Sequence, residues 1–338
     1  MKFKNFKHKK IIFLILIFLL LIIIGTAFIS FWPTKKVYHV GIISGTDFFV
    51  GTDEGFIRKM SELGYRENVD IVYDVKKINN DLSEANKIIE KFLKNKVDLI
   101  FSFPTNVAVL SKELTQNTKI PVVFGDATIE GTGLVKDVNF PGDNITGVRQ
   151  ATIETVVERF DLMHELVPNA KKYLIFYQSD LSVMLGQLRE LALLAEKSGV
   201  DLILKPVDST SDIDFYLKEQ ENMSSFDFDA ILTIIEPVAN IPSSSQILSV
   251  FAEKYKIPFG GAPLNNEACQ NLFGVSIDNA LAGSQAAVLA DKVLRGVPAG
   301  SIPVVTAEKY IQINLKMAEK LGLKIDDSLI SRANIVIR

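Results

Sequence analysis

Cysteine, histidine and tryptophan are scarce in this chain, and their scarcity excludes several classes of protein. The 338 residues include one cysteine, three histidines and one tryptophan. The single cysteine, Cys269, allows no internal disulfide and no cysteine-based metal cluster, and it lies too late in the chain to carry a lipid anchor. The histidines, His8, His39 and His164, are scattered, so the sequence predicts no metal site and no histidine-based catalytic triad.

A strong charge of either sign is absent as well. Lysine and arginine number 37 against 40 acidic residues, for a net charge of −3, which argues against a nucleic-acid partner. No nucleophile stands at a useful spacing from a base, so the sequence does not predict an enzyme. Gly131-Thr132-Gly133 matches part of a dinucleotide fingerprint but follows no tight strand–helix turn, and no cofactor is expected.

What the chain does contain is one long hydrophobic run near its start. Five lysines fall within residues 2–10, an unbroken apolar run covers Ile11–Ile24, and apolar character continues to Trp32. Roughly twenty such residues span a bilayer at about 1.5 Å per residue. The basic flank places that end in the cytoplasm. We therefore expect residues 1–36 to form an uncleaved transmembrane anchor, while Gly25-Thr26-Ala27 leaves a cleaved signal peptide open.

Either alternative exports the globular part. It would work at the extracytoplasmic face of the cell membrane, held by the N-terminal helix, or free in the periplasm if the segment is cleaved.

From Val37 onward, apolar strands alternate with amphipathic helices. The first three strands are expected at Val37–Ile43, Val69–Val75 and Val97–Phe101. This alternation predicts a parallel sheet with right-handed crossovers. After Gly147 the pattern restarts with a helix at Ile153–Leu166. The sequence therefore predicts an α/β fold of two similar halves around a common cleft.

Ligands of open α/β sheets bind outside the carboxyl ends of the strands, and polar residues stand at those positions here. Thr105 and Asn106 begin a helix, so free backbone N–H groups there could hold a carboxylate. Asp126 and Glu236 each follow a strand and could pair with an ammonium group. Together these groups suit a small zwitterion.

Aromatic side chains at the same strand ends could contact the apolar part of such a solute. Phe48, Phe49 and Tyr177 are the candidates. Simpler roles stay open for the polar candidates: a helix N-cap for Thr105 or Asn106, a turn cap for Asp126, and a solvated loop position for Glu236.

Several segments together resemble one known family. They are Ile120–Phe124, Pro141–Val148, Leu166–Lys172 and Ala290–Gly296, followed by Asn314-Leu315, Leu321–Leu323 and Ser331–Ala333. In combination they resemble the ABC transporter substrate-binding proteins that include tryptophan- and other aromatic-amino-acid-binding members. The resemblance covers essentially everything from Val40 onward.

The resemblance implies a type I periplasmic-binding-protein fold, in which each lobe is a parallel sheet flanked by helices and the chain crosses between lobes three times. Strand order alone suggests two consecutive halves, and that plan would miss the return of the chain to the first lobe. The implied ranges are 37–148 plus 276–300 for lobe one and 149–275 plus 301–338 for lobe two, with Thr146, Gly147 and Val148 in the hinge.

The implied function is the capture of a small solute, expected to be an amino acid, with an aromatic amino acid as a candidate. Hinge closure would then mark the loaded state for a membrane permease driven by a cytoplasmic ATPase. The alternative is a sensor that presents its ligand to a membrane receptor or kinase. The expected ligand contacts are Thr46, Asp47, Phe48, Thr105, Asn106, Asp126, Tyr177, Glu236 and Asp278.

The chain departs from the family pattern in three places. Many relatives carry a cysteine directly after the signal segment, and this chain has none there. Relatives commonly have an Asp-Pro pair after the fourth strand, whereas Asp126 is followed by Ala127-Thr128. In the loop that Glu236 occupies, the relatives' aspartate is shifted here or the loop is lengthened.

Overall fold

The computed structural model describes residues 36–45, 49, 51–79, 81–178, 182–263 and 271–338. The predicted membrane anchor falls on residues 1–36, nearly all of which lie outside these ranges. Among the described residues, no helix combines the length and apolar character needed to cross a membrane.

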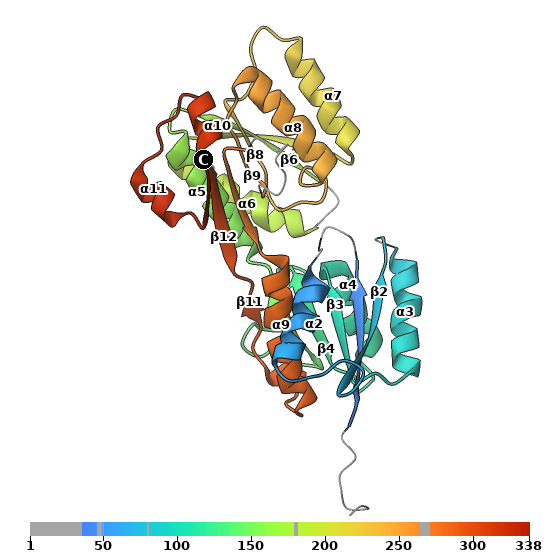
Figure 1. The fold of residues 1–338 in the computed structure, drawn as a ribbon. Coiled ribbons are helices and arrows are strands. Elements are labelled where there is room, and N and C mark those ends of the chain that lie inside the picture. The colour runs from blue at the N-terminus through green and yellow to red at the C-terminus, as the bar shows by residue number, and fades with distance from the viewer. Residues whose placement is uncertain (1–35, 46–48, 50, 80, 179–181, 264–270) are drawn as a thin grey trace, which may run out of the picture.

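Two separate sheets organise the chain into two lobes (Figure 1). The first sheet has six strands in the order β11-β5-β4-β3-β1-β2. Its elements are β1 (Tyr38–Ser44), α2 (Thr52–Glu62), β2 (Ile71–Lys77), α3 (Leu82–Lys94), β3 (Leu99–Phe103), α4 (Thr105–Thr115), β4 (Val122–Ala127), β5 (Ile145–Arg149), α9 (Asn279–Leu294), the 3-10 helix η2 (Ala299–Ser301) and β11 (Val305–Thr306).

The second sheet has seven strands in the order β13-β12-β10-β9-β8-β6-β7. Its elements are α5 (Thr152–Leu166), β6 (Lys172–Tyr177), α6 (Ser182–Ser198), β7 (Asp201–Pro206), α7 (Thr210–Glu221), β8 (Ala230–Leu232), α8 (Pro242–Tyr255), β9 (Phe259–Gly261), β10 (Phe273–Ile277), β12 (Lys309–Asn314), α10 (Leu315–Lys320), α11 (Asp327–Arg332) and β13 (Ile335–Ile337).

Each sheet is buried on both faces, which explains its apolar strands. In lobe one, Val40 and Ile42 of β1 pack toward α2 and α9, whereas Ile43 packs toward α3 and α4. In lobe two, Tyr173 and Leu174, adjacent in β6, likewise belong to cores on opposite faces. Alternation along a strand thus builds two cores per lobe.

The second sheet is not entirely parallel, which corrects the predicted all-parallel lobe. β12 pairs antiparallel with β10, with Val275 opposite Ile311. The reversal arises because the chain enters β12 from lobe one, having already passed through α9 and β11. A strand that arrives from the cleft side runs away from the cleft, opposite to β10.

The chain passes between the sheets three times: after Arg149, between Ile277 and Asn279, and between Thr306 and Lys309. The predicted ranges differ from this pairing at two strands. β10 belongs to the second sheet as far as Ile277, and β11, predicted within lobe two, pairs with β5 through Val305 and Val148.

Candidate functional site

The parallel strands of lobe one direct their carboxyl ends toward lobe two, as the arrowheads of β1 and β2 show in Figure 1. The edge of the sheet that faces the other lobe therefore carries the residues that follow β1, β3 and β4. Predicted contacts Thr46, Asp47 and Phe48 follow β1 and lie outside the described residues. Phe49 is half-buried and packs against the α2–α9 core.

Thr105 and Asn106 form the first turn of α4, directly after β3. The Thr105 hydroxyl accepts a hydrogen bond from the Thr128 backbone N–H at 3.0 Å, which ties α4 to the loop after β4. Asn106 is exposed, and its Oδ1 accepts from the Val107 N–H at 2.9 Å. The Ala108 N–H donates to the Pro104 carbonyl at 2.9 Å, so an anion at this end of α4 would meet the N–H groups of Thr105 and Asn106.

Asp126 lies on the neighbouring strand β4 and is the most unusual residue of this edge. Its side chain is 1% exposed, and its backbone adopts the left-handed region with φ of 53°. The pairing of β4 with β5 shifts register between Phe124 and Ala127, so Asp126 lies in a bulge. Its Oδ1 accepts a hydrogen bond from Gln150 Nε2 at 2.9 Å, while its Oδ2 has no partner among the described residues.

The carboxyl group of Asp126 is poorly suited to carry a charge in this state. Burial raises its pKa to about 7, and the hydrogen bond from Gln150 offsets part of that effect. A cationic group placed at Oδ2 would favour the ionised form. Asp126 therefore offers a buried acceptor that lacks one partner.

In lobe two, the buried charged residue Arg159 bridges the ends of two strands, and sequence reasoning missed it. This α5 residue is 2% exposed, and its guanidinium donates to the Val275 carbonyl at 2.8 and 3.0 Å and to the Thr233 carbonyl at 3.0 Å. It thus links β10 to the end of β8 across β9. Burial lowers the pKa of Arg159 to about 9, although the nearby Glu236 carboxylate raises it.

Gly261, at the end of β9, leaves room for that guanidinium. Its φ is 109°, and a Cβ there would lie 2.5 Å from the Thr233 carbonyl oxygen and 3.2 Å from Arg159 Cδ. The sequence does carry a signal for Arg159. Its spacing from Val156 and Met163 places this charged residue on the apolar, buried face of α5.

Glu236 is 5% exposed and uses its carboxylate within its own turn. Its oxygens accept hydrogen bonds from the backbone N–H groups of Val238, at 2.9 Å, and Ala239. Burial raises the pKa of Glu236, whereas these N–H groups lower it. The same loop is fixed by Gln187, whose amide exchanges two hydrogen bonds with the Ile235 backbone at 2.7 and 2.9 Å. A solute contact by Glu236 stays a prediction.

The remaining predicted contacts lie at other strand ends. Tyr177 ends β6, is half-buried and packs against the core of lobe two. Asp278 is exposed at the second crossing, where it caps α9 by accepting from the Leu281 N–H at 2.9 Å. Hydrogen bonds in the described chain do not join either side chain to Asp126.

The predicted hinge residues Thr146, Gly147 and Val148 are buried within β5, just before the first crossing. The Thr146 hydroxyl donates to the Ile302 carbonyl at 2.8 Å, and a Cβ at Gly147 would lie 2.3 Å from the Phe124 oxygen. These three residues therefore pack within the first sheet, and the crossing between the lobes begins after them, at Gln150.

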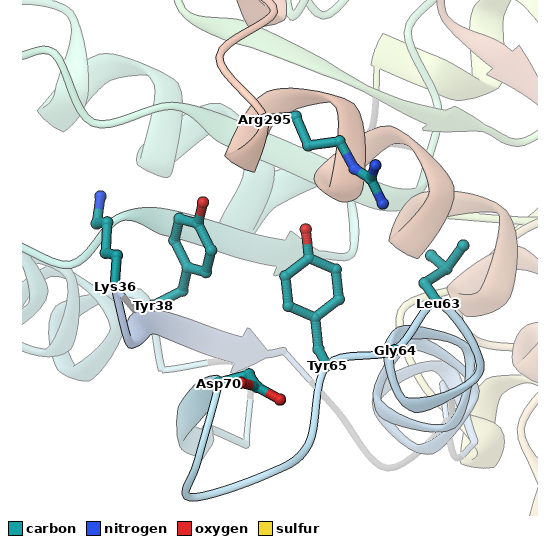
Figure 2. A pocket seen from close by; sticks show the side chains of 7 residues that line it. All are labelled: Lys36, Tyr38, Leu63, Gly64, Tyr65, Asp70 and Arg295. Atoms are coloured by element: carbon teal, nitrogen blue, oxygen red, sulfur yellow. The ribbon is translucent and has the colours of Figure 1, made fainter. Parts of the chain in front are cut away.

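A hollow of about 180 Å³ lies at the opposite pole of lobe one, beside the amino end of β1 (Figure 2). Its two tyrosines meet edge to face at 5.9 Å, with both hydroxyls bonded: Tyr38 to the Leu294 carbonyl and Tyr65 to Asp291. Arg295 also pairs with Asp291. Since these polar groups already have partners, the hollow lacks the features of a solute site.

Comparison with known proteins decides the family. The model of the ABC transporter substrate binding protein family matches residues 40–337. The chain belongs to this family. It is 28% identical over 259 residues to a tyrosine-binding protein of Clostridioides difficile strain R20291, covering 76% of this chain and 72% of the relative. Members of the family bind solutes for ABC transporters and work outside the cytoplasm.

Solved structures agree on the fold, which is that of the type I periplasmic binding proteins. A Streptococcus pneumoniae ABC domain in complex with L-Trp superposes with a TM-score of 0.77 at 24% identity, covering 89% of this chain and 100% of that one. A ligand-free, open substrate-binding protein with adhesive properties from Clostridium difficile gives a TM-score of 0.70 at 22% identity, covering 89% and 99%.

Proposed function

We propose that this protein captures an aromatic amino acid between its lobes and delivers it to an ABC importer. The main support is that a group suited to an ammonium and a group suited to a carboxylate lie at the ends of two adjacent strands. Asp126, with its buried acceptor Oδ2, lies near the carboxyl end of β4, and the first turn of α4 follows β3, which pairs with β4. An ammonium group suits the first and a carboxylate the second.

The names of two relatives support an aromatic side chain for the solute. One is described as tyrosine-binding, and the other was solved with L-Trp. In this proposal the α-amino group contacts Asp126, the carboxylate lies at Thr105 and Asn106, and the ring approaches Tyr177 and the loop after β1. In the same proposal Glu236 approaches the solute from lobe two, and Asp278 approaches it from the second crossing, where it caps α9.

Thermal-shift measurements against the amino acids test this proposal directly. At a hundredfold excess over the dissociation constant, a solute should stabilise the protein by about 2.7 kcal/mol. Tyrosine and tryptophan should give the largest shifts. A response to sugars or nucleosides, with none to any amino acid, would overturn the amino-acid assignment.

Delivery to a permease and tethering by residues 1–36 are further parts of the proposal. The expected location is the outer face of the cell membrane, and the expected partner is a permease with its cytoplasmic ATPase. In reconstituted vesicles, the loaded protein should stimulate ATP hydrolysis by that transporter. If the loaded protein instead activates a membrane receptor or kinase and leaves ATP hydrolysis unchanged, the sensor alternative replaces the importer.

A further inference from the structure

Gln150 is the first residue of the first crossing, between the end of β5 and the start of α5. Its backbone N–H donates to the Ala127 carbonyl at 2.9 Å, and its side-chain Nε2 donates to Asp126 Oδ1 at 2.9 Å. The crossing is thus bonded to the bulge of β4 by both its main chain and its side chain. Through this contact, a residue of the first crossing holds the Asp126 carboxylate, the group proposed to bind the solute.

A second link joins the same loop to lobe two. The hydroxyls of Thr128 and Thr152 lie 3.0 Å apart and are both buried, and Thr152 is the first residue of α5. The Thr128 backbone N–H in turn donates to Thr105, at the open end of α4. Asp126 is therefore bonded directly to Gln150 in the first crossing, and Thr105 is linked through Thr128 to Thr152, just after that crossing.

We propose that Gln150 is a positioning residue: by holding Oδ1 of Asp126 against the first crossing, it leaves Oδ2 as the acceptor for the amino group of the solute. The inference rests on the proposed function. Recognition of the amino group then depends on a residue of the first crossing that contacts the Asp126 carboxylate and not the solute.

The hydrogen-bond inventory of a carboxylate explains why one donor matters so much. Two oxygens share the carboxylate charge, and a donor that occupies Oδ1 fixes the plane of the group. Asp126 has no other side-chain donor among the described residues. Without Gln150, both oxygens would be unpaired in a buried site, and the side chain would rotate or bind a proton. Either change removes the acceptor that an ammonium group needs.

Paired ligands test the inference on the intact exported domain. Affinities for L-tyrosine and L-tryptophan are compared with those for their des-amino analogues, the corresponding arylpropionates, by isothermal titration calorimetry. In Gln150→Leu, affinity for the amino acids should fall about tenfold to a hundredfold, the range for a hydrogen bond to a charged group. Affinity for the arylpropionates should change by less than about threefold, because they lack the amino group.

Gln150→Lys provides a second, independent variant. Its ammonium group would keep Asp126 bonded and ionised but would neutralise the charge, so amino-acid binding should be lost and arylpropionate binding retained. Gln285→Leu is the matched control. This glutamine lies on α9 and donates to the Thr306 carbonyl at 3.4 Å beside the third crossing, without contacting Asp126. It should leave both ligand classes unchanged.

The outcomes separate the inference from the function on which it rests. If the wild type binds no amino acid, the proposed function fails. If the wild type binds amino acids but Gln150→Leu weakens both ligand classes equally, or neither, the role of Gln150 is overturned. Selective loss of the amino acids in both Gln150 variants supports it.

Discussion

At the scale of single residues, the two lobes solve the problem of a buried polar group differently. Each of the three guanidinium nitrogens of Arg159 donates to a carbonyl oxygen of its own lobe without a solute. Asp126 keeps one oxygen unpaired. Hydrogen bonds of this kind join strands within a lobe, whereas a buried oxygen with no partner is a place where a ligand can be recognised.

Replacing Asp126 should change stability in a pH-dependent way. The folded pKa of about 7 lies above the ordinary value of 3.8, so the folded state holds a proton that the unfolded chain releases. The contribution of this group to stability is therefore present below about pH 4 and is lost as pH rises through 7. Asp126→Asn should gain stability over the wild type across that window, on the order of 4 kcal/mol above pH 7.

Urea unfolding of the ligand-free protein at pH 5 and pH 8 measures that gain. The variant's advantage should be clearly larger at pH 8. An equal difference at both pH values would mean that the carboxyl group is not buried in solution.

Removing the Arg159 side chain should destabilise lobe two. Arg159→Met leaves the carbonyls of Thr233 and Val275 without their donors, and we expect a loss of about 2–4 kcal/mol. Arg332→Met is the control, because Arg332 pairs with Glu165 at the surface and should contribute less than about 1 kcal/mol. Denaturant midpoints compare the two variants. Equal losses would exclude a bracing role for Arg159.

At the scale of elements, α2 and α9 hold lobe one together across a long gap in sequence. Their backbones approach closely: a Cβ at Gly283 would lie 1.9 Å from the Thr52 oxygen, and one at Gly55 would lie 2.0 Å from the Ala280 oxygen. The Ser284 hydroxyl also donates to the Gly55 carbonyl at 3.1 Å. Only glycine allows this contact, by which the returning chain is bound to lobe one.

Gly283→Ala should therefore separate the two helices and cost about 2–4 kcal/mol of unfolding free energy. The matched variant is Gly186→Ala in α6, where the new methyl would meet only Ile153 Cδ1, at 3.3 Å. That change should be neutral or stabilising by up to about 1 kcal/mol, since alanine favours a helix over glycine. Thermal melts of both variants distinguish the effects, and a neutral Gly283→Ala would contradict the close packing.

Periodicity predicted most elements, and the misses have local causes. The helix expected at Ile153–Leu166 is confirmed at Thr152–Leu166. The same periodicity predicts a helix over Gln246–Tyr255, but the structure begins it at Pro242, a first-turn proline that the apolar pattern does not register. β5 was predicted only as an extended hinge segment, because five residues that include Gly147 carry little strand pattern.

Contacts between residues far apart in the sequence limited how much of the site could be predicted. Strand ends indicated Thr105 and Asp126, since their positions follow from local pattern. Gln150 and Arg159 act through contacts 24 and 116 residues away in the chain, and no local spacing marks those contacts.

At the scale of the whole molecule, an ionic cluster connects the lobes at two crossings. Arg149 pairs with Glu130 of lobe one at 2.9 Å and with Glu154 of α5 at 2.5 Å, and it also donates to Thr306. Lys309 pairs with Glu158 of α5 at 2.6 Å. These contacts restrain the first and third crossings together.

Arg149→Met should loosen that restraint and widen the range of lobe angles in the ligand-free protein. Small-angle X-ray scattering should report a larger radius of gyration, and ionic strength near about 1 M should shift the wild type in the same direction, because the Debye length falls to about 3 Å. Lys218→Met, which breaks an exposed pair with Asp214 within α7, is the control. Identical scattering curves for all three proteins would show that the cluster does not restrain the angle.

The three crossings have a practical consequence for following this protein in real time. Lys36 precedes β1 of one sheet, and β13 ends the chain in the other. A fluorophore attached at each of these positions would report on a different lobe, with no insertion into either fold. With the proposed closure of the lobes on a bound solute, energy transfer between the two dyes would give a reagentless optical readout of solute concentration.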